Sequence, residues 1–341
     1  MDDACEYCER SREAGHSYCV DCGRPVTAVR GPAEGPREKN ATLTTAVRVV
    51  GLIILLSCVA MLFFEIYAVF WTMDGISAGM GGYRLGILFL VPSPVLLFYV
   101  GGVAAKFYYI FLVTAVIVSF ILVLYNSREG LLRVLRGDTD RMDDMPMYGV
   151  ATLFAMYISM NLILVLLVSS FGYDPASPED PAEEWMLWYS LLNASVWEEV
   201  ICRVLMIGVP LMAAGLALKE KGSWKRLFGH SEMDRFAVVF IIFSAVMFAY
   251  GHLSGWDLFK LIPTFVCGLA LGYLFVKYGL YASIMLHFLV DYLSSFVWMF
   301  DSVAADMLLS LFILSMVVLG APFIVLYARR GISHLKKVMS S

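Results

Sequence analysis

The sequence predicts an all-α polytopic membrane protein with about eight transmembrane helices and a small zinc ribbon at the N-terminus. Of the 341 residues, 60% are hydrophobic and only 16% are charged. Soluble domains have about 45–50% apolar and about 25% charged residues. After residue 42 the apolar residues are gathered in long runs, and four of the seven cysteines lie before residue 24. These observations favour a chain that crosses a bilayer several times and carries a short metal-binding segment.

The predicted zinc ribbon, residues 1–23, contains two CxxC pairs separated by ten residues. The pairs are Cys5 with Cys8 and Cys19 with Cys22. Two such pairs suit four thiolates around a tetrahedral Zn²⁺, which would supply the folding energy of so short a unit. A disulfide-linked or disordered tail is the alternative. Zinc thiolates need a reducing compartment, so we expect a cytosolic N-terminus and a possible cytosolic protein partner. The segment is not basic enough to favour nucleic acid.

Residues 24–42 are charged and rich in Pro and Gly, which predicts a flexible linker. No signal peptide precedes the first apolar run, so we expect the first hydrophobic helix to direct insertion. The remaining cysteines, Cys58, Cys202 and Cys267, lie in apolar runs, where they are expected to be small packing residues.

Residues 43–330 form the predicted transmembrane domain, because each apolar run has roughly the length that a spanning helix needs. The runs lie at 44–72, 84–125, 148–171, 185–218, 236–252, 257–276, 280–299 and 303–328.

Charged residues between the runs predict which ends share a side of the membrane. Lys and Arg are concentrated in three segments: the loop 126–147, the loop 219–235, and the C-terminal tail 331–341 with the residues just before it. By contrast, the loop 173–184 has five acidic residues and no basic one. Short cytoplasmic loops carry excess Lys and Arg. We therefore expect the two loops, the basic tail and the N-terminus all to be cytoplasmic.

The run 84–125 is long enough for two crossings, but Pro92, Pro94 and the pair Gly101–Gly102 interrupt it. If the zinc ribbon and the loop after residue 125 are both cytoplasmic, the chain between them crosses the membrane an even number of times. The run 44–72 crosses once, so the run 84–125 must also cross once. We expect a re-entrant or interfacial segment at 84–93, followed by a long helix kinked at the glycines. Eight crossings result. Nine would put the zinc ribbon outside.

Strongly polar residues recur inside three of the runs. Glu198, Glu199 and Arg203 lie in the first, and Glu199 and Arg203 are spaced i,i+4, so their side chains can meet. The other two runs contain pairs with the same spacing. These pairs are Phe248 with His252 and His287 with Asp291.

Each pair alone could be structural, because polar side chains commonly join membrane helices. Together they predict a site, since intramembrane ionisable residues are functional candidates by default. A carboxylate and an imidazole can bind and deprotonate water, and a second imidazole can stabilise the oxyanion that forms on a carbonyl. This chemistry suits amide hydrolysis. Neither Cys202 nor Ser195 is identified as an activated nucleophile.

At these residues the sequence resembles the CAAX protease and bacteriocin-processing family, also called the ABI family, which includes the Ras-converting type of prenyl-protein endopeptidase. Its EExxxR, FxxxH and HxxxN/D-like motifs stand here at 198–203, 248–252 and 287–291. The resemblance covers about 185–300, the peptidase core, and residues 1–180 carry no motif of the family. Asp291 stands where the prenyl-protease members usually have Asn.

The resemblance implies an intramembrane endopeptidase acting on a membrane-associated, possibly prenylated, substrate. Glu198 would be the general base on water, assisted by His252. His287 and Asp291 would stabilise or orient the oxyanion side, and Glu199, Arg203 and Phe248 would support the site.

The family has been described both as metallopeptidases and as glutamate-type peptidases without a catalytic metal. Glu and His are zinc ligands, so the sequence permits either. We favour the metal-free form, because the helix pattern is not HExxH.

A non-enzymatic membrane protein is the alternative, either a proton-coupled transporter whose buried Glu, His and Asp relay protons or a scaffold. Inverted repeats would favour a transporter, and none is visible.

The depth of the candidate site residues in the membrane is also left open by the sequence. Charge counting puts His252 and Glu198 nearer the outer side and His287 nearer the cytoplasmic end. Either the site opens outward, or the helices are too irregular for this estimate.

Overall fold

The computed structural model describes residues 38–89, 93–136, 138, 142–175, 183–220, 222–254 and 256–340. It divides into two units, residues 1–47 and 48–341. The zinc ribbon predicted at 1–23 lies outside the described residues, as does the linker as far as residue 37. Helix α2 (Glu38–Gly79) already includes the last five residues assigned to the linker.

Residues 84–89 and 95–101 are the two strands of a β-hairpin, so the expectation of a long helix kinked at the glycines is wrong, while a re-entrant or interfacial position of this segment stays a prediction. Strands β1 (Arg84–Phe89) and β2 (Val95–Gly101) pair antiparallel. Pro94, just before β2, has no N–H and would break a helix interior, whereas apolar β-branched and aromatic residues suit a pleated strand. Gly102 has φ +55°, a conformation that favours glycine, and it starts helix α3 instead of kinking it.

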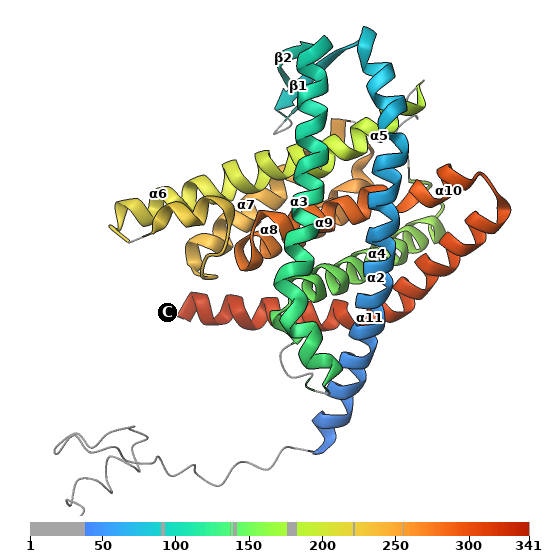
Figure 1. Cartoon of the computed structure of the whole chain (residues 1–341). Coiled ribbons are helices and arrows are strands. Elements are labelled where there is room, and N and C mark those ends of the chain that lie inside the picture. The colour runs from blue at the N-terminus through green and yellow to red at the C-terminus, as the bar shows by residue number, and fades with distance from the viewer. Residues whose placement is uncertain are drawn as a thin grey trace, which may run out of the picture. The chain divides into compact units, whose positions relative to one another are not determined.

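Helix α3 (Gly102–Leu135) is the single helix of the run 84–125, so the run contributes one candidate crossing, as predicted. Within the larger unit, α2 and α3 lie side by side (Figure 1). The rings of Phe63 on α2 and Phe120 on α3 meet edge to face with centroids 5.0 Å apart. Figure 1 also shows that these two helices cross the remaining long helices at a steep inclination.

Further helices follow in the described part of the chain after residue 142. They are α4 (Pro146–Ser170), α5 (Glu184–Asn193), α6 (Val209–Ala217), α7 (Arg235–Gly251), α8 (Leu261–Tyr278), α9 (Leu280–Asp291), α10 (Ser295–Phe300) and α11 (Val303–Ser340). Among the described residues, seven helices or helix runs are long and apolar enough to cross a membrane. Helix α7 is a shorter apolar helix of 17 residues, about 26 Å long at 1.5 Å per residue.

Helix α4 lies in the core of the larger unit and packs against α3, α8, α9 and α11. Its contact with α11 is close, because a Cβ at Gly320 would meet the carbonyl of Ala155. Small residues allow membrane helices to approach in this way. Ser159 donates a hydrogen bond of 2.9 Å to the Val317 carbonyl at the same contact.

The basic loops and the basic C-terminus meet at one end of the helices. Arg330 pairs with Asp143 at 2.6 Å, joining the C-terminal helix to the first basic loop. His334 lies 2.8 Å from the Met233 carbonyl, joining it to the second. These contacts agree with the prediction that the three segments share a side. The tail beyond residue 330 continues α11 as helix to Ser340.

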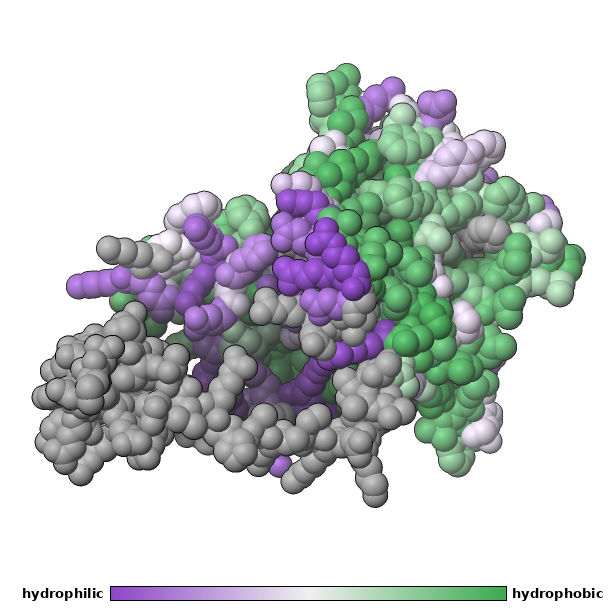
Figure 2. Space-filling model, turned by 60° about the horizontal axis from the view of Figure 1, so that its bottom comes forward, coloured by the Kyte–Doolittle hydropathy of each residue, from purple (hydrophilic) through white to green (hydrophobic). Residues whose placement is uncertain are grey.

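Apolar side chains cover a wide area of the larger unit, while polar side chains gather in separate patches (Figure 2). Many large apolar residues on the long helices face outward, including Phe107, Ile110, Leu166, Val239 and Val318. A soluble protein would bury such a surface, whereas lipid covers it without cost. The surface and the long apolar helices identify an integral membrane protein of all-α class.

Candidate active site

The adjacent glutamates lie in an irregular part of the run 184–217. Between α5 and α6 the backbone forms two π-helical segments, Ala194–Glu198 and Val200–Gly208. π-Helical turns are rare and are found frequently at functional sites. The wider turn changes the angle between successive side chains, so the two carboxylates enter different surroundings.

Glu199 and Arg203 form a fully buried ion pair, as their i,i+4 spacing predicts. Arg203 Nε lies 3.2 Å from Glu199 Oε2, and both side chains have no exposed surface. The two groups are close without the alignment of a hydrogen bond. Arg203 Nη1 donates to Ser244 Oγ at 3.1 Å, and Ser244 in turn donates to the Cys202 carbonyl at 2.6 Å. Arg203 is therefore bound from both sides.

Glu198 lies between two imidazoles from other helices. Its Oε2 is 3.9 Å from His252 Nε2 and 3.8 Å from His287 Nε2. Its side chain is 15% exposed, whereas that of Glu199 is fully buried. Among the described residues, Glu198 Oε2 has no hydrogen-bond partner. Of the two glutamates, Glu198 is therefore the one with a partly exposed side chain and with a buried oxygen still open to a further hydrogen bond.

The ring of His252 is oriented by the helix end on which it lies. Its Nδ1 is 2.8 Å from the Phe248 carbonyl, which can only accept, so Nδ1 carries the hydrogen. In the neutral ring Nε2 then presents its lone pair toward Glu198. The Phe248 ring supports this arrangement, with its centroid 4.7 Å from that of His252 and 5.8 Å from that of His287. The Arg203 guanidinium lies 4.8 Å from the Phe248 centroid.

His287 connects the two glutamates. Its Nδ1 lies 2.9 Å from Glu199 Oε1, which fixes the ring. Its Nε2 lies 3.5 Å from Asp291 Oδ2, one turn further along. Ser195 donates to Asp291 Oδ2 at 3.1 Å, so Asp291 also contacts the helix that carries Glu198. All the site residues expected from the sequence are thus brought together from α7, α9 and the π-helical run.

The structure does not place these residues at the different membrane depths that residue counting predicted. His287 was expected nearer the cytoplasmic end than His252 and Glu198, yet the three lie in contact. Helix α9 has only 12 residues and continues through the 3₁₀ turn Tyr292–Ser294 into α10. Together with the π-helical turns, this makes the helices irregular, which was the second explanation considered.

Two charged residues near the site escaped the sequence analysis. Glu65 on α2 is fully buried, and neither carboxylate oxygen has a hydrogen-bond partner among the described residues. It interacts electrostatically with Asp291. Lys260, just before α8, interacts electrostatically with Asp291 and Glu198. Each is a solitary charge within an apolar run, and that signal could have marked both.

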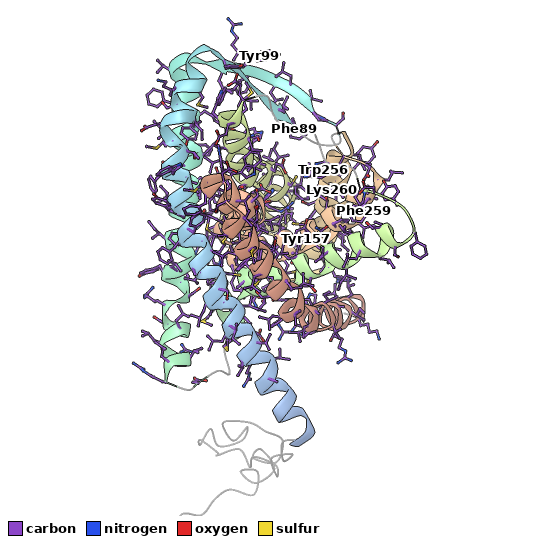
Figure 3. All side chains as sticks on the ribbon, turned by 90° about the vertical axis from the view of Figure 1, so that its right-hand side faces the viewer. Phe89, Tyr99, Tyr157, Trp256, Phe259 and Lys260 are labelled. Atoms are coloured by element: carbon purple, nitrogen blue, oxygen red, sulfur yellow. The ribbon has the colours of Figure 1, made fainter. Side chains whose placement is uncertain are left out.

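The hairpin also contacts the site. The indole Nε1 of Trp197 donates to the Leu88 carbonyl on β1 at 2.8 Å. Trp197 directly precedes Glu198, so the hairpin is attached to the helix that carries the adjacent glutamates. In Figure 3, Trp256 and Lys260 lie just below the end of the hairpin at Phe89. No sequence motif linked residues 84–101 to the site.

The described residues contain no group of three or more His, Cys, Asp and Glu side chains arranged to hold a metal ion. The expectation of a metal-free reaction remains a prediction. The four cysteines expected to bind structural zinc lie outside the described residues.

The model of one protein family matches this region. It is described as type II CAAX prenyl endopeptidase Rce1-like, and it matches residues 181–293, a segment that contains all three motifs. No curated protein and no solved structure matches the chain. Residues 181–293 are therefore similar to the Rce1-like CAAX endopeptidases, a family of peptide-bond hydrolases.

Proposed function

We propose that the protein hydrolyses a peptide bond of a membrane-associated substrate with water activated by Glu198 and His252. The observation that carries this proposal is the position of Glu198 Oε2, under 4 Å from the Nε2 atoms of both His252 and His287. These separations exceed a direct hydrogen bond and suit atoms that share one water as a common partner.

In the proposed reaction the water oxygen bonds to the peptide carbonyl carbon as its proton passes to Glu198. His252 Nε2 accepts a hydrogen bond from the second hydrogen of the water, which turns a lone pair of the water oxygen toward the carbonyl carbon. The C–N bond then breaks, and the proton held at Glu198 goes to the leaving nitrogen. Glu198 thus acts first as general base and then as general acid, and His252 positions the water.

His287 would stabilise the oxyanion as a doubly protonated imidazolium, with Nδ1–H donating to Glu199 and Nε2–H to the oxyanion. The neighbouring carboxylates of Glu198 and Asp291 favour this charged form. Asp291 would orient that ring and is a positioning residue, since a carboxylate cannot donate a hydrogen bond unless it is protonated. Glu199, Arg203 and Phe248 hold the imidazoles and touch no reacting atom. The family description supports a prenylated C-terminal peptide as the substrate class.

The purified protein in proteoliposomes provides the test, with a farnesylated peptide and its unprenylated counterpart as substrates and mass spectrometry of the products. We expect Glu198→Gln and His252→Ala each to reduce kcat by about 10²–10⁴-fold, the usual contribution of a positioned acid or base. Glu183→Gln, an exposed glutamate just before α5, is the matched control and should leave kcat unchanged.

Full cleavage by a folded Glu198→Gln variant would contradict the mechanism. Cleavage that stops after treatment with a chelator and returns with zinc would contradict the metal-free form. Equal rates for the farnesylated and unprenylated peptides would contradict the prenylated substrate class while leaving the hydrolytic mechanism intact.

A further inference from the structure

Lys260 places a positive charge at the edge of the site. It ends the 3₁₀ turn Leu258–Lys260 and belongs to the candidate span that continues through α8. Its side chain is only partly exposed. A cation in such a segment is costly unless it faces the protein interior or a water-filled cavity, so it needs a partner or a function.

The ammonium group is held by an aromatic ring. Lys260 Nζ lies 3.6 Å from the centroid of the Trp256 ring, a close cation–π contact. Among the described residues, no carboxylate forms an ion pair with it. Trp256 therefore fixes the direction of the ammonium group, which is in direct contact with none of the described carboxylates.

The nearest acid in sequence, Asp257, is engaged elsewhere. Its Oδ1 accepts a hydrogen bond from the Phe259 N–H at 3.0 Å, and its Oδ2 accepts one from the Tyr173 hydroxyl at 2.6 Å. The hydrogen bond to Asp257 raises the pKa of Tyr173 above its usual value, which keeps the hydroxyl a donor. These bonds secure the turn that presents Lys260.

Lys260 lies within the electrostatic reach of the reactive groups. It interacts with Asp291 and Glu198 and also acts on His252. The other cation near the site, Arg203, is fully buried and already bound by Glu199 and Ser244. Within the described part of the chain, Lys260 is therefore the cation near the site that a substrate can still contact.

We propose that Lys260 binds a carboxylate of the peptide substrate and makes that carboxylate a requirement for tight binding. The proposal rests on the proposed function. A single ammonium group neutralises the single charge of a carboxylate, and its hydrogen bonds to that group are charge-assisted. The carboxylate comes either from the free C-terminus of the substrate or from an acidic side chain near the cleaved bond, and the experiment separates these sources.

The test measures binding in the Glu198→Gln background, so that it does not depend on cleavage. The probes are three short farnesylated peptides: one with a free C-terminal carboxylate, the same peptide as a carboxamide, and a carboxamide peptide with Glu as its last residue. We expect the free acid to bind about 10–100-fold more tightly than the plain carboxamide, the value of a charge-assisted hydrogen bond. Lys260→Ala should abolish this difference in affinity, because it weakens the binding of the free acid only.

If the C-terminus is the source, the Glu-ended carboxamide binds like the plain carboxamide. If a side chain is the source, the Glu-ended carboxamide alone binds tightly, and the free acid binds like the plain carboxamide. Lys260→Arg should restore most of the preference. The matched control is Lys277→Ala, which removes a lysine that also lies over aromatic rings near the other end of α8. It should leave the preference intact.

Equal binding of all three peptides, including no detectable binding of any, overturns the proposal. A preference that survives Lys260→Ala also overturns it. So does a Lys260→Ala effect that appears only in anionic lipid, which would assign the lysine to a lipid phosphate. Failure of the proposed function looks different, because wild-type protein would then cleave no peptide while the Glu198→Gln variant still preferred the acid.

Discussion

Two adjacent glutamates have different surroundings because their neighbours differ. Glu199 has an arginine one turn on and an imidazole from α9, and both contacts are sealed from solvent. Glu198 faces two imidazole nitrogens and retains some exposure. A buried, paired carboxylate is suited to hold groups in place, whereas a reachable one is suited to handle a proton.

Arg203 should be required for stability, because its loss leaves Glu199 buried beside only His287. We expect Arg203→Met to lower the free energy of unfolding by about 3–5 kcal/mol. Thermal unfolding in detergent measures the effect, and adding Glu199→Gln to Arg203→Met should recover part of it. The control is Arg226→Met, which breaks a more exposed pair with Glu220 and should cost less than about 1 kcal/mol. Equal effects of Arg203→Met and Arg226→Met would contradict this account.

Glu65 should reduce the stability of the fold. Its carboxyl group is buried on α2 and has no hydrogen-bond partner among the described residues. Leaving a polar group in this state costs about 1–3 kcal/mol. We therefore expect Glu65→Leu to raise the thermal unfolding midpoint in detergent, and Glu65→Gln to raise it less. Glu129→Leu, at a side chain 70% exposed, should change it little. A lower midpoint for Glu65→Leu would show that the carboxyl group is bound in the folded protein.

At the scale of elements, the hairpin β1–β2 and the π-helical run determine how the site is built. The Trp197 indole joins them through the Leu88 carbonyl. The hairpin in turn continues directly into α3 at Gly102. A substitution at this junction should therefore change the stability of α3 and the position of the hairpin.

Gly102 should be intolerant of a side chain, whereas its neighbour should not. Gly102 has φ +55°, and no atom lies within 4 Å of a Cβ built there, so strain rather than contact opposes a substitution. Gly102→Ala should cost about 1–2 kcal/mol, the price of a left-handed conformation with Cβ. Gly101 has φ −149°, so Gly101→Ala should cost less. Thermal unfolding compares the two variants, and equal losses would contradict the reasoning.

At the scale of the molecule, the basic segments gather at one end of the helices. The basic loops and the C-terminus meet through Arg330 with Asp143 and His334 with Met233. Tyr173, the first residue of the acidic segment, contacts Asp257 instead. The meeting of the basic segments agrees with the excess of Lys and Arg in cytoplasmic loops.

Both termini should lie on the cytoplasmic side. Reporter tags at residues 1 and 341 of the full chain should give the same cytoplasmic signal, and a tag inserted at residue 178 should give the opposite one. Terminal tags found on opposite faces of the membrane would contradict the prediction of eight crossings. A chain with all three tags on one face would contradict the assignment of the acidic segment.

The sequence by itself determined the class of the molecule and predicted the residues of the candidate site. Lipid accepts only long apolar helices, so composition and run length predict the architecture. Charged side chains are costly inside such helices, so each of Glu198, His252, His287 and Asp291 can be recognised in the sequence as an exception. The i,i+4 contact of Glu199 with Arg203 follows from helix geometry alone. The zinc ribbon remains a prediction.

Only the tertiary structure decided which distant groups meet. It placed two imidazoles around one glutamate, put Glu65 and Lys260 near Asp291, and folded residues 84–101 into a hairpin against Trp197. None of this has a local signal, because a solitary charge carries no information about the helix that will face it. The π-helical turns are also a product of packing, and they shift side-chain directions that an ideal helix would fix.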